Sequence, residues 1–295
     1  MPKCPKCKKT VPQDARSCIH CATELELDAM DRIFDVKGEE CLKRANLYYN
    51  GDGVERDFEV AVHWYRKAAE KKNAKAEAYL GLAYLMGEGV PQDASVAVDW
   101  FKRAAAQGDP IGIFNLGKAY YVGYGVQKDR VEAVKWLKVA AEAGEAEAQF
   151  LMGGSCLNTK NYAEAHRWFT KAGMQGHPHA QYQVGYAYSI GDCVPQNHRE
   201  AVKWFKAAAR QGDEAAAYAL GISYYNGDGV ARDVAEAIKW LKESADKDFP
   251  EALYALGRCY HLGDGVSKSS ATAITLWKRA ANLGNTDAKK ALGYI

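Results

Sequence analysis

The sequence lacks long apolar runs and has almost no excess of charge of either sign. No stretch approaches the roughly 18 uninterrupted apolar residues that predict a membrane-spanning helix. The 39 basic and 37 acidic side chains leave a net charge of +2, so no global field favours nucleic acid or an anionic membrane. The first ten residues carry lysines but no apolar core, unlike a secretory signal. On this basis we expect a cytoplasmic protein.

Motifs of catalysis are also scarce. Neither the H-E-x-x-H metal motif nor the G-x-S-x-G nucleophile motif occurs. The segment from Gly112 to Lys118 nearly spells a phosphate-binding loop, but Ala119 stands where serine or threonine must hold Mg²⁺. His177 and His179 can either offer two imidazoles to a metal or lie on the surface at the start of a helix. We predict that the protein is not an enzyme.

The eight cysteines do not recur with the spacing of a disulfide-bonded secreted repeat. Four are scattered singly, at Cys41, Cys156, Cys193 and Cys259, which favours reduced thiols. The other four form two C-x-x-C pairs near the N-terminus, namely Cys4, Cys7, Cys18 and Cys21. Two such pairs can hold one structural Zn²⁺ in a tetrahedral site. So short a segment cannot build a core, and the metal must supply most of its folding free energy.

This N-terminal segment resembles the zinc-ribbon modules of many prokaryotic proteins, although Lys8 and Ala22 replace the usual glycine after each pair. Four free thiols on a disordered tail are the alternative. A ribbon can also contact nucleic acid, since the segment holds Lys3, Lys6, Lys8, Lys9 and Arg16. The net charge of about −2 on four thiolates with Zn²⁺ offsets part of that patch, so nucleic acid is the less favoured partner.

Tryptophan recurs at a fixed interval through the rest of the chain. Trp64, Trp100, Trp136, Trp168, Trp204 and Trp240 follow one another at steps of 36, 36, 32, 36 and 36 residues, and Leu276 continues the interval. Glycine and alanine columns keep the same interval. A Gly-x-Gly-Val turn recurs at 51–54, 87–90, 123–126, 227–230 and 263–266. Self-similarity at such a period indicates a repeat architecture.

Each repeat predicts two helices. In the second repeat, Leu80 and Tyr84 lie at helical spacing, and Gly87 supplies the backbone angles that end the first helix. Asp93 stands where an N-cap would satisfy the free N–H groups of the next helix, which carries Trp100. One such hairpin cannot bury its own apolar face, so neighbouring hairpins must stack, with tryptophan filling the space between them.

The fourth repeat departs from the pattern. It is four residues short, residues 157–162 replace its Gly-x-Gly turn, and Cys156 replaces its tyrosine. In the fifth repeat, Cys193 replaces the second turn glycine. We expect a tighter turn inside the fourth repeat and a local change of superhelical curvature. The last residues, 288–295, match only the start of a first helix and are expected to cap the stack.

The unit A-x-x-x-L-G-x-x-Y-x-x-G-x-G-V-x-x-D-x-x-x-A-x-x-W resembles the Sel-1-like repeat, which is related to the tetratricopeptide repeat. The segment from Gly81 to Gly108 matches it nearly throughout, and the resemblance covers about residues 38–295. It implies an all-α fold, a right-handed superhelical solenoid of about seven helix-turn-helix repeats. It also implies a role in protein–protein interaction, without naming a partner.

These patterns divide the chain into a zinc ribbon at residues 1–24, a linker or short docking helix at 25–37, and a repeat solenoid at 38–295. The expected repeats are 38–73, 74–109, 110–145, 146–177, 178–213, 214–249 and 250–285, followed by a cap helix at 286–295. Met30, Ile33 and Phe34 lie at helical spacing, which favours the docking helix.

If the first helix of each repeat lines a concave groove, as in tetratricopeptide-like superhelices, an aromatic stripe faces a partner there. The candidate partner-binding residues are Phe114, Tyr121, Phe150, Tyr182, Tyr186, Tyr218, Tyr225, Tyr254 and His261. Aromatic side chains dominate the energetics of many interfaces. The alternative is that the same rings pack inside the stack.

The sequence therefore predicts a non-catalytic scaffold that holds a peptide or helix of another protein, with structural Zn²⁺ in its N-terminal ribbon. Two alternatives stay open. One is a cell-envelope or β-lactam-related hydrolase of the Sel-1-like group, and the other is a regulator that contacts nucleic acid through the ribbon.

Overall fold

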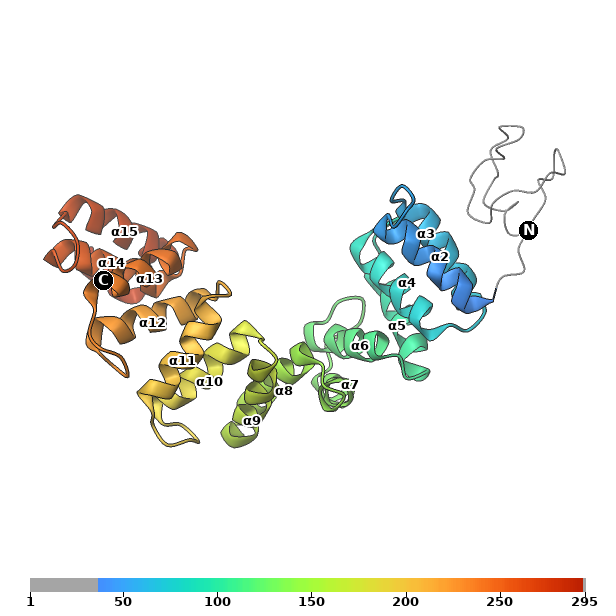
Figure 1. The fold of residues 1–295 in the computed structure, drawn as a ribbon, viewed down its shortest axis with the longest axis horizontal. Helices are drawn as coiled ribbons and strands as arrows, with labels where there is room; N and C mark the ends of the chain where they lie inside the picture. The colour runs from blue at the N-terminus through green and yellow to red at the C-terminus, as the bar shows by residue number, and fades with distance from the viewer. Residues whose placement is uncertain (1–36, 294–295) are drawn as a thin grey trace. The chain divides into compact units, whose positions relative to one another are not determined.

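The computed structural model describes residues 37–293, and this part of the chain is helical throughout, with no strand (Figure 1). Helices of 12 or 13 residues follow one another, and a shorter one ends the series. Their bounds are α2 Gly38–Asn50, α3 Phe58–Glu70, α4 Ala74–Met86, α5 Ala94–Ala106, α6 Pro110–Val122, α7 Arg130–Glu142, α8 Ala146–Asn158, α9 Tyr162–Met174, α10 Pro178–Ile190, α11 His198–Ala209, α12 Glu214–Asn226, α13 Val234–Asp246, α14 Pro250–Leu262, α15 Ser270–Asn282 and α16 Thr286–Ala291. The prediction of two helices per repeat is confirmed.

The chemistry of the helix ends is that expected from the sequence. Gly87 has a left-handed φ of 75° and donates its N–H to the Ala83 carbonyl at the end of α4. The Asp93 side chain accepts hydrogen bonds from the backbone N–H groups of Ser95 and Val96 at the start of α5. Such caps satisfy groups that have no partner inside a helix.

Small residues let the two helices of each pair approach closely. A Cβ on Gly81 of α4 would clash with the ring of Phe101 on α5, and one on Gly153 of α8 would clash with Phe169 on α9. The alanine column is buried throughout, with the side chains of Ala61, Ala97, Ala133, Ala165, Ala201, Ala237 and Ala273 at most 1% exposed. The close approach of the paired helices therefore requires small residues in the glycine and alanine columns.

Tryptophan packs between successive pairs, as predicted. Trp240 of α13 belongs to a core cluster built from α11 and α12, and Trp204 of α11 packs against the cluster around α9 and α10. Trp64, Trp168 and Trp240 are buried, whereas Trp100, Trp136 and Trp204 keep part of their surface exposed.

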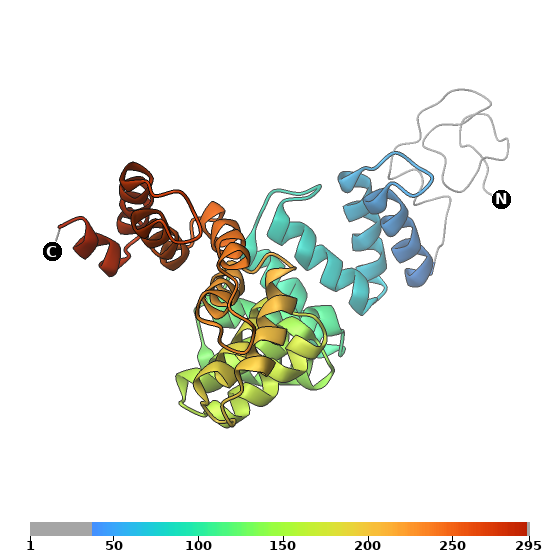
Figure 2. The same cartoon turned by 60° about the vertical axis from the view of Figure 1, so that its left-hand side comes forward.

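The described part of the chain divides into two compact units, with the boundary between Ala143 and Gly144. In the described part of the first unit, α2 to α7 form three antiparallel pairs. In the second unit, α8 to α15 form four pairs, and each helix packs against the next along the chain. The short α16 packs on α15 at the end of this unit, and Ala288 joins the core there (Figure 2).

The fourth repeat has the tight connection that its sequence predicts. Only residues 159–161 join α8 to α9, whereas residues 227–233 join α12 to α13. Lys160 takes a positive φ of 58°, and the Asn161 side chain accepts from the backbone N–H of Glu164 to cap α9. α9 nevertheless has the same length as α13 and carries the same alanine and tryptophan columns.

Candidate protein-binding face

The nine residues predicted to contact a partner all lie on the first helices of the pairs, and none is fully buried. Phe114 and Tyr121 lie on α6 of the first unit. The other seven lie on α8, α10, α12 and α14 of the second unit, and we call them the aromatic face: Phe150, Tyr182, Tyr186, Tyr218, Tyr225, Tyr254 and His261. Equivalent positions of stacked repeats share one side of the stack. The second unit thus carries a continuous candidate surface.

At one end of this face, Phe150 stacks on His177 with ring centroids 4.6 Å apart and contacts Phe169 at 5.7 Å. His177 Nε2 lies 2.9 Å from Glu147 Oε2, and its Nδ1 accepts from the backbone N–H of Ala180. His177 therefore caps α10 and lies within hydrogen-bond distance of Glu147. Among residues 37–293, no group of three histidine, cysteine or acidic side chains is arranged to hold a metal.

In the middle of the face, each tyrosine rests one side of its ring on a neighbour. The ring centroid of Tyr182 lies 6.0 Å from that of Phe205 and 6.2 Å from that of Tyr186. The centroids of Tyr218 and Phe249 are 5.6 Å apart. Burial raises the pKa of Tyr182 and of Tyr218, and nearby carboxylates, including Glu251, raise both further. These phenols therefore stay neutral and keep their hydroxyl protons for donation.

At the other end, the Tyr225 hydroxyl donates to Asp264 Oδ2 at 2.6 Å, and this hydrogen bond raises the tyrosine pKa. Tyr254 and His261 both lie against Trp277, with centroid distances of 6.3 and 5.4 Å. Core packing and exposure thus coexist at the same residues. Each ring is seated on the stack and presents its outer part to solvent.

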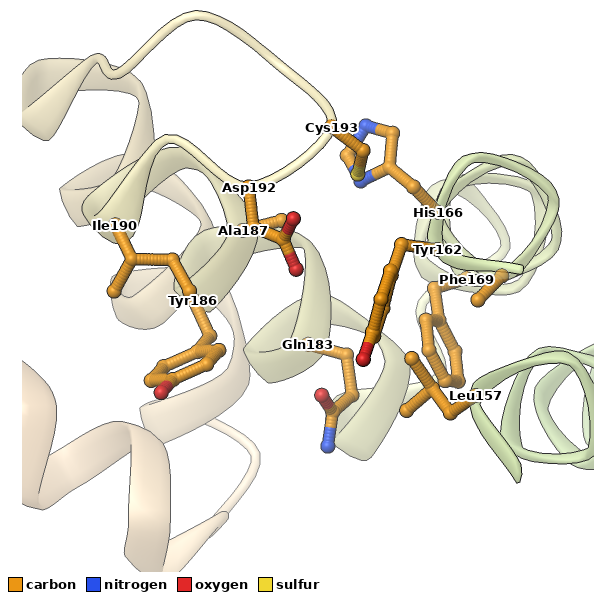
Figure 3. A pocket seen from close by; sticks show the side chains of 11 residues that line it. Leu157, Tyr162, His166, Phe169, Gln183, Tyr186, Ala187, Ile190, Asp192 and Cys193 are labelled. Carbon is orange, nitrogen blue, oxygen red and sulfur yellow. The ribbon is translucent and has the colours of Figure 1, made fainter. Parts of the chain in front are cut away.

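Two pockets open beside the aromatic face. The first, which we call the His166 pocket, has a volume of about 150 Å³ (Figure 3). Its lining comes from α9, α10, the end of α8 and the turn after α10: Leu157, Tyr162, Ala165, His166, Phe169, Gln183, Tyr186, Ala187, Ile190, Asp192 and Cys193. The second, the Arg258 pocket, has a volume of about 260 Å³ and is lined by Ile222, Tyr225, Asn226, Leu241, Ala255, Arg258 and Cys259.

The two pockets occupy equivalent places in the repeat. Each lies between the first helices of successive pairs, over the second helix of the earlier pair. By alignment of the repeats, Phe169 in the first corresponds to Leu241 in the second, and Tyr186 corresponds to Arg258. The second unit therefore repeats a notch whose walls differ in chemistry.

The polar groups of the His166 pocket include the imidazole of His166 and the thiol of Cys193. Burial lowers the pKa of His166, whose Nδ1 is buried without a hydrogen-bond partner in the described structure. Burial also raises the pKa of the Cys193 thiol, and the Asp192 carboxylate raises it further. A protonated thiol is a poor nucleophile, so this arrangement favours binding over covalent chemistry.

Sequence reasoning named the residues of the aromatic face as candidates but predicted neither pocket. The signals that could have found the first were the four missing residues and Cys193, two departures that the structure places at the same pocket. The predicted zinc ligands Cys4, Cys7, Cys18 and Cys21 lie outside the described residues, as does the predicted docking helix.

Comparison with known sequences and structures agrees with this architecture. The sequence profile of the Sel1 repeat matches seven successive segments, at residues 41–73, 74–109, 110–145, 146–177, 178–213, 214–249 and 250–285. No protein with a curated description matches the sequence significantly. None of the described helices is long and apolar enough to cross a membrane.

Two solved structures are similar over most of this chain. A protective antigen of uropathogenic Escherichia coli strains, which displays an SLR fold, is 33% identical over 92% of this chain, with a TM-score of 0.77. The match spans 59% of the antigen's own length. A Sel1 repeat protein from Oxalobacter formigenes is 28% identical over 91% of this chain and 78% of its own, with a TM-score of 0.70.

Proposed function

Because the chain belongs to the Sel1 repeat family, whose members generally bind other proteins, we propose that it is a non-catalytic scaffold that holds a segment of a partner protein. The partner lies along the aromatic face of the second unit. The observation that carries this proposal is that partly exposed rings recur at equivalent positions of four successive first helices. Rings already seated on the stack lose little entropy when they bind, which suits them to an interface.

The bound segment is a peptide or a helix that crosses several repeats. It gains apolar contact from the rings and hydrogen bonds from neutral phenols such as those of Tyr182 and Tyr218. The two pockets beside the face offer places for its longest side chains. We propose that residues 1–24 bind one Zn²⁺ through Cys4, Cys7, Cys18 and Cys21 and that this ribbon contacts a second surface.

A pull-down from native lysate with mass spectrometry tests the binding face. Changing Tyr182, Tyr218 and Tyr225 together to alanine is expected to leave the helical circular dichroism intact and to abolish co-purification of the partner. A matched control changes Met174 and Ile274 to alanine, since these exposed apolar side chains lie on the second helices α9 and α15. Partners retained by the tyrosine variant, or lost equally from both variants, would contradict the proposal.

Metal analysis of the full chain tests the ribbon. We expect one zinc per chain in the purified protein, and none after Cys4 and Cys7 are changed to serine. The single cysteines Cys41 and Cys259 serve as controls, because both are buried in the helical core. Zinc that is absent from the unchanged protein, or that survives the loss of Cys4 and Cys7, would refute the ribbon.

A further inference from the structure

The turn glycines of the regular repeats leave no room where they meet the preceding second helix. A Cβ on Gly89 would clash with the backbone at Phe58, the first residue of α3, and one on Gly229 would clash with the backbone at His198, the first residue of α11. In the fifth repeat Cys193 replaces this glycine, so a side chain is present at a backbone position with a positive φ of 56°. Cys193 lines the His166 pocket together with residues of α9, the helix that follows the shortened connection.

The His166 pocket therefore lies where the fourth repeat lost four residues and the fifth gained a side chain. We propose that this pocket binds the side chain of a lysine or arginine from the partner protein. The inference rests on the proposed function and names the chemistry that one of its pockets selects. Shape, charge and an unpartnered polar atom support it separately.

The shape fits the stem of one long side chain. A volume of about 150 Å³ is large enough for a group the size of benzene. Leu157, Phe169 and Ile190 supply apolar wall, against which the methylenes of lysine or arginine can pack. The Tyr162 ring stands on one side of the space and the Asp192 carboxylate points in from the other (Figure 3). A cation over a tyrosine ring is attracted by the negative face of the ring.

The charge of the lining favours a cation. Asp192 is the one acidic residue among the lining side chains, and none of them is lysine or arginine. The equivalent carboxylate in the seventh repeat, Asp264, accepts a hydrogen bond from the hydroxyl of Tyr225. Leu157 replaces that tyrosine in the fourth repeat, so within residues 37–293 no side chain donates to Asp192. Its carboxylate is free to pair with a ligand.

An unpartnered ring nitrogen adds a second acceptor. His166 Nδ1 is buried and has no hydrogen-bond partner among the described residues. When the proton is on Nε2, a neutral imidazole accepts at Nδ1. A bound ammonium or guanidinium group has several N–H donors and can satisfy both the carboxylate and the imidazole once the ring turns Nδ1 toward the pocket. A purely apolar side chain would leave both acceptors unmatched.

The Arg258 pocket provides an internal control. At the position of Tyr186 it carries Arg258, which adds a positive charge to the lining. Its acidic neighbour Asp264 is already engaged by Tyr225. A lysine side chain would meet like charge there, so the two equivalent pockets should differ in their preference.

Titration of the full-length protein with small probes, followed by NMR of backbone amides, tests the inference. The probes are the N-acetyl, N′-methylamide derivatives of lysine, norleucine and glutamate, which differ in the charge at the end of the side chain. We expect the lysine probe to shift the amides of Gln183, Asp192 and Cys193 and to bind about tenfold more tightly than the norleucine probe, a difference of about 1.4 kcal/mol. The glutamate probe should not shift these amides.

Variants separate the pocket from the rest of the surface. Asp192→Asn should remove the advantage of lysine over norleucine, whereas Arg258→Gln should leave it unchanged. Because Asp192 is exposed, its substitution should not alter the helical circular dichroism. Equal binding of lysine and norleucine, or an advantage that survives Asp192→Asn, would overturn this inference. Neither result would affect the proposed binding face, which the tyrosine variants test independently.

Discussion

The junction between the fourth and fifth repeats differs from the junction between the sixth and seventh at the turns and hardly at all in the core. Ala165 and Ala237 are both buried, Trp168 and Trp240 are 6% and 7% exposed, and Phe169 corresponds to Leu241. The connections differ in length and the turn residue changes from Gly265 to Cys193. The stack thus tolerates a change of loop wherever the core columns persist.

This difference shows which residues determine stacking and which determine binding. Core columns repeat because every pair must bury the same faces against its neighbours. Turn residues vary because a loop at the edge of the stack alters only the local surface. The His166 pocket and the Arg258 pocket arise from one repeated notch whose rim has changed.

The largest expected effect tests the shared core. Trp168→Ala and Trp240→Ala should each destabilise the protein by about 3–5 kcal/mol, since each removes a large buried aromatic side chain. Trp136→Ala should destabilise the protein less, because the Trp136 side chain is only partly buried. Chemical denaturation followed by circular dichroism measures the three values. A much smaller loss for Trp168 than for Trp240 would mean that the fourth repeat has lost core packing together with its turn.

The next effect separates the two kinds of turn. Gly229→Cys should destabilise by about 2–4 kcal/mol, because a side chain there combines a left-handed backbone with overpacking against α11. Cys193→Gly should instead be neutral or stabilise by up to about 1 kcal/mol, since it relieves left-handed strain at a position with room. Thermal unfolding of both variants checks the contrast. Similar losses at the two positions would show that the turn of the fifth repeat is packed like the others.

Much of this fold can be predicted from the sequence because the same residue types recur at the positions that determine helix ends and helix packing. The alanine column predicts close helix approach, Asp93 predicts an N-cap and Gly87 predicts the end of a helix, and all three are confirmed. The interval of 32 residues at Trp168 predicts the shortened connection. Each of these features depends on neighbours close in sequence or one repeat away.

The candidate site is less predictable because it depends on the space left between side chains. For the aromatic stripe, the sequence left core packing and a binding groove as alternatives. In the structure rings such as Tyr182 are only partly buried, and the spacing of residues along the chain does not predict the exposed fraction of a side chain. In the sequence Cys193 is a local exception, and in the structure it lines the same pocket as Tyr162. An empty volume is a property of several repeats together, and no single column encodes it.

A loop exchange tests whether the two departures depend on each other. Replacing residues 159–161 with residues 227–233 gives the fourth repeat a regular turn, and combining this change with Cys193→Gly completes a double-mutant cycle. We expect the double variant to be more stable than the sum of the two single changes predicts, with a coupling of about 1–2 kcal/mol between the two sites. Urea denaturation gives the four stabilities. Strict additivity would mean that the two departures are unrelated.

The smallest effect concerns the one histidine in the pocket lining. Burial holds the folded-state pKa of His166 below its usual value of 6.5. As the pH falls through 6.5, the unfolded chain binds a proton at this residue before the folded chain does, so the free energy of unfolding decreases. The contribution is complete above the unfolded value and is lost as the pH falls through the folded value.

His166→Ile removes this contribution and copies Ile238, which stands at the equivalent position of the regular junction. Between pH 7 and pH 5 the variant should lose less stability than the unchanged protein, as measured by urea denaturation at each pH. His177 and His179 remain in both proteins with their partners Glu147 and Asp213, so the comparison isolates the change at His166. If the two proteins lose stability in parallel, His166 is solvated as a surface histidine would be. The pocket would then have no unpartnered acceptor to offer a bound cation.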